Sequence, residues 1–400
     1  MAKIAYIGIP AHGHTNPTLP VMQELVARGH EVLYYNAESF RTKVEPTGVD
    51  FRPYPEPVPT EREVSAALHK FINASLMLSG MAEHLTPFVL AEMERELPDL
   101  LLYDSAAMAG YIAARTQGIP HICLITHFVL DGSRSALDPW AMARFIWSAI
   151  PHLPKLMGWK RRMARQYGKG IAGGITEYGD LNIVFTSREF HPKNNFTDER
   201  FRFVGPSINP ATRDDHSAFD LPDAGVVVYI SLGTINYLDE YFYRAAFQAF
   251  ANYPAQFILS VGKHTDIERL GEIPANFIVK QHVPQLAVLQ RADAFITHGG
   301  MNSVHEGLYY GVPEVVVPHQ FEQLLNGRRV AETGAGILLS DEHGRVTAAQ
   351  LRGALDEVLH DPGYKQQAER IGATLRDAGG YLRAVEEIEA FVGIRERQPA

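Results

Sequence analysis

Short apolar runs alternate with amphipathic segments along the first half of the chain. Between the first two runs, Leu19, Met22 and Leu25 recur at helical spacing and form one apolar stripe. Asn16 and Pro17 are typical of a helix start, with the asparagine as N-cap and the proline in the first turn. This order predicts a right-handed βαβ unit. The runs that we expect to be strands of a buried parallel sheet are residues 3–9, 31–36, 99–104, 121–126, 181–187 and 201–205.

The same alternation resumes in the second half, after a polar stretch. Residues 206–224 carry three prolines and few apolar positions, which makes them the best linker candidate. The expected strands that follow are residues 226–233, 256–262, 276–281, 294–300 and 314–318. Strands alternating with helices in both halves predict an α/β fold of two doubly wound, Rossmann-like domains. We place these domains at 1–207 and 225–400, joined by a linker at 208–224, with the last helix a candidate for packing back onto the first domain.

Composition and charge exclude several classes of protein. The 400 residues carry a formal net charge of -9, so the chain lacks the basic character of a nucleic-acid-binding protein. The single cysteine, Cys123, rules out an internal disulfide and fits a reducing cytoplasm, and we interpret it as a core thiol rather than a nucleophile. No apolar run reaches the roughly 18 residues of a membrane-spanning helix, and no secretory signal pattern is present. We therefore expect a cytoplasmic protein with no integral membrane contact.

A His-Gly-Gly turn ends one of the expected strands of the second half. Its backbone, at residues 298–300, can approach a ligand closely, and a helix follows from about Met301. The N-terminus of that helix is a ready anion site, to which Asn302 and Ser303 can add side-chain donors. Glu306 lies one turn deeper on the same face, where its carboxylate could accept hydrogen bonds from a ribose diol. The alternatives are a simple tight turn for the glycines and a solvated helix surface for Glu306.

The motifs of the second half occur in a fixed order: HVPQ, THGGMNS, a glutamate, GVP, and the pair EQ followed by an asparagine. This order resembles the donor-sugar signature of inverting family 1 glycosyltransferases, above all the bacterial macrolide- and flavonoid-type UDP-sugar enzymes. GHTNPTLP, LLYDSAAMAG, FVGPS and ISLGT extend the resemblance over nearly the whole chain. It implies the GT-B fold, in which two Rossmann-like domains face each other across a cleft, the first binding the acceptor and the second the nucleotide sugar.

The resemblance also implies which residues hold the UDP-sugar. Glu306 would bind the ribose with Gln285 nearby, Glu322 and Gln323 would bind the sugar hydroxyls, and Val283 would meet the base through its backbone. The pyrophosphate contacts would come from Thr234, His298, Asn302 and Ser303. The full set of positions assigned to the donor is Thr234, His282, Val283, Gln285, His298, Gly300, Met301, Asn302, Ser303, Glu306, Glu322 and Gln323.

Three of these positions depart from the family pattern. His282 stands where the family often has a tryptophan that stacks on the uracil, and a histidine offers a smaller ring that can hydrogen-bond instead. Met301 stands where plant relatives have tryptophan, and Glu322 stands where many members have aspartate. Glucose is the first hexose that the resemblance suggests for the donor.

The first expected strand leads into a His-Gly-His loop. Because ligands bind at the carboxyl ends of such strands, His14 is placed at the crevice, and the helix start after it disfavours a charged imidazole. By resemblance His14, in Gly-His-x-x-Pro, is the general base, and Asp104 at the end of a later strand holds its ring and stabilises the imidazolium. The alternative for Asp104 is a helix N-cap. We expect His12 to pack in the loop rather than to form half of a metal site.

The sequence contains no Asp-x-Asp pair, which is the usual divalent-metal clamp on nucleotide sugars in the other main glycosyltransferase fold. We therefore expect no metal and no other cofactor. Leaving-group charge would instead be borne by backbone N–H groups, His298 and the helix dipole. The expected reaction inverts the anomeric centre and gives a β product from an α-linked donor.

The acceptor side is expected in two apolar stretches of the first half. Residues 127–159 hold all three tryptophans, and with residues 68–81 they could form an apolar wall for a phenolic, flavonoid or macrolide-like molecule. The candidate contacts are His127, Phe128 and Trp140. The alternative is an amphipathic helix pair packed on the first domain. A peripheral membrane contact is disfavoured because the stretch is not strongly basic.

Two rival functions stay open from the sequence. One is another GT-B enzyme that acts on UDP-sugars, such as an epimerase. The other is a non-catalytic protein that binds nucleotide sugars, against which the presence of both His14 and Asp104 argues. A dehydrogenase with two Rossmann domains is disfavoured because no G-x-G-x-x-G follows the first expected strand.

Overall fold

The chain folds into two compact units. The structure is a computed structural model that describes residues 1–60, 63–64, 67, 71–129, 147, 150–168, 177–192, 198–212, 219, 225–233, 240–263, 265–339 and 345–396. Unit 1 comprises Met1–Ser187, Pro192–Ser207 and Ala378–Ala400, and unit 2 comprises Arg188–His191 and Ile208–Asp377. The chain thus returns to unit 1 for its last helix. Most of the expected linker at 208–224 lies outside the described residues.

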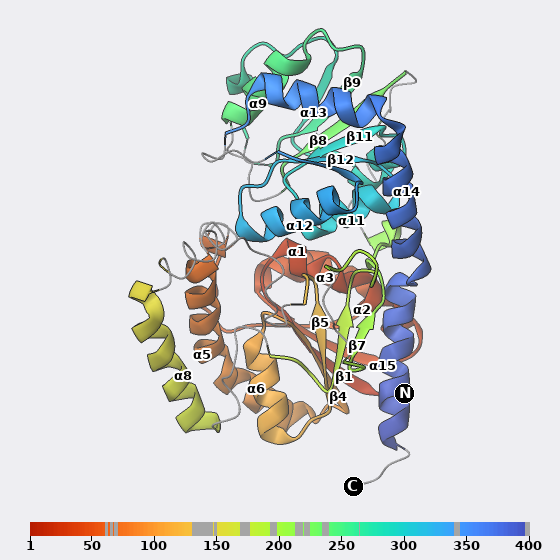
Figure 1. The fold of residues 1–400 in the computed structure, drawn as a ribbon. Helices are drawn as coiled ribbons and strands as arrows, with labels where there is room; N and C mark the ends of the chain where they lie inside the picture. The colour runs from red at the N-terminus through yellow and green to blue at the C-terminus, as the bar shows by residue number, and fades with distance from the viewer. Residues whose placement is uncertain are drawn as a thin grey trace. The chain divides into compact units, whose positions relative to one another are not determined.

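Unit 1 is built on a sheet whose neighbouring strands all run parallel, in the order β3-β2-β1-β4-β5-β6-β7 (Figure 1). The strands are β1 Lys3–Ile7, β2 Glu31–Asn36, β3 Asp50–Pro53, β4 Leu100–Asp104, β5 His121–Ile125, β6 Leu181–Val184 and β7 Phe201–Phe203. Each of the six apolar runs predicted for this half contains one of them. The sequence missed β3, an edge strand in which only Phe51 is buried.

Helices cover both faces of the unit 1 sheet. The α-helices of this unit are α1 His12–Thr15, α2 Thr18–Ala27, α3 Arg41–Val44, α5 Phe71–Glu96, α6 Met108–Gln117, α8 Leu153–Tyr167 and α15 Gly380–Glu396. Met81 of α5 and Trp159 of α8 belong to one hydrophobic cluster, together with residues of α6. Met22 of α2 and Ile388 of α15 belong to a second cluster. The last helix therefore packs on unit 1 although the chain reaches it only after unit 2 (Figure 1).

The helix start expected at Asn16 is wrong. Residues 12–15 already form the short helix α1, and the Asn16 N–H donates to the carbonyl oxygen of His12. Asn16 consequently has helical backbone angles, whereas an N-cap needs an extended conformation. The next helix, α2, begins one residue later than predicted, with Pro17 as an N-cap that makes no side-chain hydrogen bond.

Unit 2 repeats the architecture on a second all-parallel sheet, in the order β10-β9-β8-β11-β12-β13 (Figure 1). Its strands are β8 Val227–Ser231, β9 Gln256–Ser260, β10 Phe277–Lys280, β11 Ala294–Thr297, β12 Glu314–Val316 and β13 Gly336–Leu338. Its α-helices are α9 Glu240–Phe250, α10 Gln285–Leu289, α11 Met301–Tyr309, α12 Phe321–Glu332, α13 Ala348–His360 and α14 Pro362–Asp377. The prediction of two Rossmann-like α/β domains is thus confirmed. Among the helices described in both units, none is long and apolar enough to cross a membrane.

Glu314 is a buried acid in the interior of unit 2. It begins β12, its surface is fully covered, and neither carboxylate oxygen has a hydrogen-bond partner among the described residues. Gly307 of α11 packs directly against it, because a Cβ at Gly307 would overlap Glu314 Oε1. Burial in these surroundings raises the pKa of Glu314 well above its ordinary value.

Replacing Glu314 with glutamine is expected to stabilise the protein at neutral pH and to change little in acid. Because the folded-state pKa is raised, the stability that the protonated acid contributes is complete below the unfolded-state pKa and is lost as the pH rises through the folded-state pKa. Glutamine has no proton to lose, so the variant should gain about 1–3 kcal/mol near neutral pH, or about 2–4 °C in Tm per kcal/mol. Thermal melts in acid and at about pH 8 test this. A variant that melts below the wild type at the higher pH contradicts it.

Candidate functional site

Each sheet has one point where the strand order reverses. In unit 1 the chain runs outward from β1 to β3 and then continues on the other side from β4, and in unit 2 the reversal lies between β8 and β11. Ligands of doubly wound sheets bind beyond the carboxyl ends of the strands at such points. In unit 1 these ends lead to His14 and Asp104, and in unit 2 they lead to Gly233 and His298. The topology therefore places residues predicted from the sequence at both reversal points.

His14 and Asp104 are in direct contact. His14 Nδ1 lies 2.9 Å from Asp104 Oδ2 and 3.0 Å from Oδ1. The Asp104 side chain is fully buried, whereas that of His14 is 24% exposed. The Ala106 N–H donates to Asp104 Oδ1 at 2.8 Å and fixes the carboxylate, but the N-cap alternative for Asp104 is wrong, because the N-cap of α6 is Ala107. Since a carboxylate accepts hydrogen bonds, Nδ1 is the protonated nitrogen and Nε2 is the one that can accept a proton.

Thr126 completes this group and was missed by the sequence analysis. It follows β5 directly, it is buried, and its Oγ1 lies 3.1 Å from His14 Nδ1. β5 pairs with β4 in parallel, which brings the ends of the two strands to the same edge of the sheet. A threonine at the end of a predicted strand was therefore the available signal, but the strand order needed to use it is not readable from the sequence.

The region around His14 differs from expectation in one respect. His14 lies within α1 and not in the first turn before a longer helix, so the helix-dipole argument for a neutral imidazole does not apply. Asp104 instead places a carboxylate next to the ring, and an adjacent negative charge favours the protonated form of an imidazole. His12 packs as predicted, with its ring 5.0 Å from that of Phe40 and its Nδ1 3.5 Å from Lys43 Nζ. Within the described part of the chain, no three His, Cys, Asp or Glu side chains are grouped to hold a metal ion.

The ring of His298 is held between two glycines in unit 2. A Cβ at Gly233 would lie 2.5 Å from the ring carbon Cε1, and a Cβ at Gly300 would overlap Nε2. Burial lowers the pKa of His298 to about 4, with a smaller contribution from His319. At neutral pH the ring is consequently uncharged, and it contributes no positive charge to the site.

Helix α11 begins directly after this histidine. Its N-cap, Gly300, has an extended backbone and provides no side-chain cap, so no N-cap side chain occupies the first N–H groups of the helix. Met301 is buried, and Asn302 and Ser303 in the first turn are half-buried. The nine-residue helix begins at Met301 as predicted, and its use as an anion site stays a prediction.

Glu306 is buried one turn into α11, so the solvated-surface alternative is wrong. Gln285 Nε2 donates to Glu306 Oε2 at 2.5 Å, and the Tyr229 hydroxyl donates to Gln285 Oε1 at 3.0 Å. Val283, two residues before Gln285, is buried, and His282 is exposed. The sequence analysis named all of these except Tyr229, which lies within β8 and looked like a core residue. The network fixes the carboxylate through three elements of unit 2.

The Glu-Gln pair lies in the first turn of α12. Glu322 is exposed, whereas Gln323 is buried and its Oε1 accepts the His319 N–H at 2.8 Å. The side-chain oxygen of Gln323 therefore already accepts a hydrogen bond. The N–H groups of its side-chain amide are the part that could bind a ligand. Two predicted site residues, Thr234 and Trp140, lie outside the described residues.

The acceptor candidates His127 and Phe128 follow β5. His127 Nδ1 lies 2.8 Å from the Phe128 carbonyl oxygen, and its Nε2 lies 3.1 Å from Ser105 Oγ. The first contact makes Nδ1 the protonated nitrogen, so Nε2 accepts the hydroxyl hydrogen of Ser105. Phe128 is buried. His127 is therefore held next to the residue that follows Asp104 in the chain.

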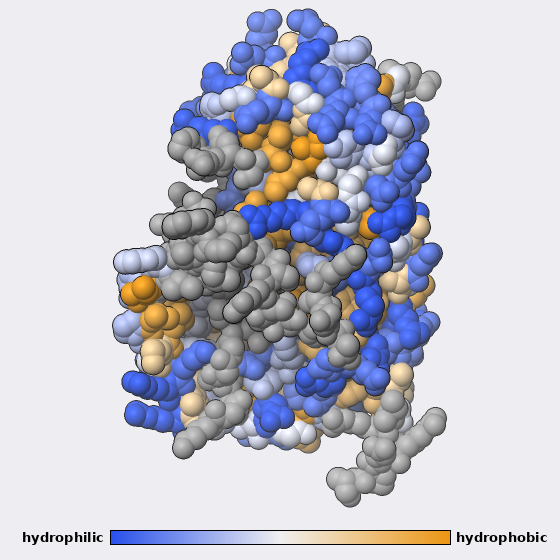
Figure 2. All heavy atoms as spheres, viewed as in Figure 1, coloured by the Kyte–Doolittle hydropathy of each residue, from blue (hydrophilic) through white to orange (hydrophobic). Residues whose placement is uncertain are grey.

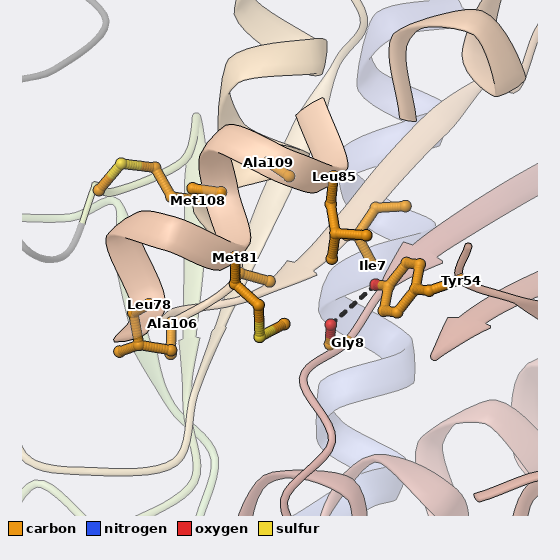
Figure 3. Close-up of a pocket in the computed structure, with 11 residues that line it drawn as sticks. Ile7, Gly8, Tyr54, Leu78, Met81, Leu85, Ala106, Met108 and Ala109 are labelled. Atoms are coloured by element: carbon orange, nitrogen blue, oxygen red, sulfur yellow. Dashed lines mark hydrogen bonds between the residues drawn. The ribbon is translucent and has the colours of Figure 1, made fainter. Parts of the chain in front are cut away.

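An apolar pocket lies between β1, α5 and α6 in unit 1 (Figure 3). It is a narrow pocket with a cavity volume of about 10 Å³, room for about one water molecule, and the Tyr54 hydroxyl on its wall donates to the Gly8 carbonyl oxygen. The lining residues are Ile7, Gly8, Tyr54, Leu78, Met81, Ala82, Leu85, Ala106, Ala107, Met108 and Ala109. Leu78 and Met81 belong to the apolar stretches predicted to face an acceptor. Ala106 binds the Asp104 carboxylate through its N–H, so the pocket wall continues into the His14–Asp104 pair.

Several known proteins are similar to this chain. Residues 246–377 match the family model described as "Erythromycin biosynthesis protein CIII-like, C-terminal domain". The chain is 32% identical over 401 residues to the uncharacterized UDP-glucosyltransferase YojK of Bacillus subtilis, with 97% of each chain covered. It is 35% identical over 398 residues to the NDP-glycosyltransferase YjiC of Bacillus licheniformis, again with 97% of each covered. The crystal structure of the glycotransferase of kitacinnamycin superposes with a TM-score of 0.81 at 31% identity, over 98% of both chains.

Proposed function

This chain belongs to the bacterial macrolide- and flavonoid-type family 1 glycosyltransferases, which have the GT-B fold, and from that premise we propose its donor, its acceptor class and its base. The proposed reaction moves a hexose, glucose first among the candidates, from a UDP-sugar to a hydroxyl group of an apolar small molecule. The anomeric centre is inverted. The contact between His14 and Asp104 beside an apolar pocket is the observation that carries this proposal.

His14 acts as the general base in the proposed mechanism. The acceptor hydroxyl gives its proton to Nε2 while its oxygen forms a bond to the anomeric carbon. The bond from that carbon to the UDP oxygen breaks on the opposite face, so an α-linked donor gives a β-linked product. Asp104 holds the ring through Nδ1 and stabilises the imidazolium, in the arrangement that orients a base in hydrolytic triads. Thr126 is a positioning residue at the same nitrogen.

The donor is proposed to bind unit 2. The N-terminus of α11, the His298 ring and the side chains of Asn302 and Ser303 would take the pyrophosphate, with Thr234 added by resemblance. Glu306, fixed by Gln285, would accept hydrogen bonds from the ribose hydroxyls. Neutral N–H donors and the helix dipole would then stabilise the charge on departing UDP, so we propose that no metal ion is required.

The acceptor is proposed to bind unit 1. The side chains that line the narrow pocket beside the His14–Asp104 pair are almost wholly aliphatic or methionine, and this apolar chemistry suits a flat phenolic or an apolar macrocycle. The family model named for erythromycin biosynthesis and the structure named for kitacinnamycin point to the same kind of molecule. An apolar part of the acceptor would lie against these side chains and leave its hydroxyl at His14.

Product analysis by mass spectrometry tests this proposal. Purified protein, with a chelator present, is mixed with UDP-glucose and a panel of phenolic, flavonoid and macrolide acceptors. We expect a product one hexose heavier than its acceptor, and a β linkage by NMR. Free glucose or a changed sugar nucleotide without any acceptor adduct would favour hydrolysis or epimerisation instead. UDP-sugar binding without turnover would favour a non-catalytic binding protein, and activity lost only with the chelator would contradict metal independence.

Gly300→Ala is expected to weaken UDP binding. The new Cβ would overlap His298 Nε2 and force the ring away from the start of α11. Loss of one hydrogen bond to a charged group corresponds to about 1.5–3 kcal/mol, which is about a 10- to 100-fold rise in the Kd of UDP. Gly353→Ala is the matched control, because it also lies in unit 2 and a Cβ there meets no other atom within 4 Å. Calorimetric titration that gives the same Kd for both variants would remove His298 from the proposed donor site.

A further inference from the structure

Helix α8 presents an apolar edge to solvent. Its inner side packs into unit 1 through Trp159 and Met163, which are buried, and Arg162 forms an ion pair with Glu83 of α5 at 2.8 Å. On the outer side, large apolar residues are exposed in the first half of the helix and among the residues that precede it. They are Trp147 at 75%, Ile150 at 48%, Leu153 at 44% and Met157 at 50% exposure. Figure 2 shows apolar atoms over the first half of α8 and hydrophilic atoms over the second.

All of the charged side chains of α8 are basic. Residues 150–168 contain no aspartate or glutamate, although the whole chain has a formal net charge of -9. Their basic residues are Lys155, Lys160, Arg161, Arg162 and Arg165. All of them are exposed except Lys160, which is half-buried. The helix is thus a local cluster of positive charge, next to exposed apolar surface, on an acidic protein.

We propose that α8 docks unit 1 on an anionic lipid bilayer, with the helix lying in the plane of the surface. Leu153, Met157 and the apolar residues before them would enter the headgroup region, and Arg161 and Arg165 would meet lipid phosphates. Interfacial helices bind by this combination of buried apolar area and attraction of Lys and Arg to anionic lipid. An apolar edge alone would suit many partners, but the complementary charge selects a negative surface. The proposal goes beyond sugar transfer and does not depend on it.

This inference reverses an expectation from the sequence. A membrane contact was disfavoured there because residues 127–159 are not strongly basic. The structure continues α8 to Tyr167, which adds four basic residues after that stretch, and it separates the buried Trp159 from the exposed apolar side chains. Of residues 130–149 only Trp147 lies within the described residues, and the surface proposed here consists of Trp147 and residues 150–168.

Vesicle flotation with the full chain tests the proposal without any sugar nucleotide. Vesicles of phosphatidylcholine with phosphatidylglycerol are compared with vesicles of phosphatidylcholine alone. One double variant, Leu153→Glu with Met157→Glu, removes the apolar edge, and another, Arg161→Glu with Arg165→Glu, reverses the charge. Leu382→Glu on α15 is the matched apolar control, since Leu382 is 43% exposed and Leu153 is 44% exposed. Arg269→Glu, at a side chain that is 76% exposed in unit 2, is the matched charge control.

The wild type is expected to float with the anionic vesicles and to be released by salt, because the attraction to the surface is screened. Each double variant should bind the anionic vesicles at least about tenfold more weakly than the wild type. Both controls should bind as the wild type does. The melting temperature of each variant confirms that Trp159 and Met163 still hold α8. Absence of flotation, equal binding to neutral vesicles, or double variants that bind normally would overturn the proposal. Sedimentation that shows self-association relieved by Leu153→Glu with Met157→Glu, without flotation, would assign the face to a second copy of the chain.

Discussion

His14→Ala is expected to lower kcat for sugar transfer by about 10²–10⁴-fold, which is the usual contribution of a positioned general base. The ring is oriented by Asp104 at 2.9 Å, and alanine leaves no group to take the acceptor proton. His14 belongs to unit 1, whereas the proposed UDP contacts belong to unit 2, so the Kd of UDP should not change. Steady-state kinetics and calorimetric titration of UDP measure the two effects separately.

His12→Ala is the matched control for this prediction. The two histidines are separated by one glycine, but His12 packs on Phe40 near Lys43, whereas His14 contacts Asp104. We expect the His12 variant to keep a rate close to that of the wild type. A His14→Ala enzyme with the wild-type rate would contradict the base assignment, and so would a His12→Ala enzyme that is equally inactive.

Asp104→Asn is expected to lower kcat by about 10³–10⁴-fold with little change in the fold. The asparagine oxygen can still accept the Ala106 N–H that now binds Oδ1. Its amide nitrogen, however, would face His14 Nδ1 and donate to it. That contact places the ring proton on Nε2, which is the nitrogen that must accept the proton of the acceptor hydroxyl. The variant therefore removes both the correct tautomer and the negative charge that stabilises the imidazolium.

Thr126→Val shows how much of the effect on the rate comes from Asp104 and how much from its neighbour at His14 Nδ1. It removes a hydroxyl 3.1 Å from the same Nδ1 and leaves Asp104 in place, so we expect a loss of about tenfold or less. Single-turnover rates at saturating UDP-sugar, with thermal melts of both variants, make the comparison. If Asp104→Asn folds normally and loses no more activity than Thr126→Val, then Asp104 does not act through the tautomer of His14.

The strands could be predicted from the sequence because strands buried on both faces form continuous apolar runs. Two strands escaped: β3 (Asp50–Pro53), which contains two charged residues and a proline, and β13 (Gly336–Leu338), which begins with a glycine. The helix start at Asn16 was misplaced for a local reason. The preceding residues already form a helical turn, and nothing in the capping pattern reports that turn.

The positions of candidate residues at strand ends were predictable where they stand in ordered motifs, as His14 and His298 do. Thr126 and Tyr229 were not, because their roles depend on which strands are neighbours. Thr126 meets His14 only because β5 pairs with β4, and Tyr229 holds Gln285 across the interior of unit 2. Burial was likewise invisible: a glutamate on a helix is usually solvated, but Glu306 is covered and fixed by Gln285.

The rate of transfer to a series of substituted phenols is the most direct test of the account, because the central claim is that His14 removes the acceptor proton. Wild type and His14→Ala are assayed with one UDP-sugar and with phenols of similar size but increasing hydroxyl pKa. A base matters most where the hydroxyl is least acidic. We therefore predict that the ratio of the wild-type rate to the variant rate grows with the pKa of the phenol. A ratio that stays constant across the series would mean that His14 supports the site without taking the proton.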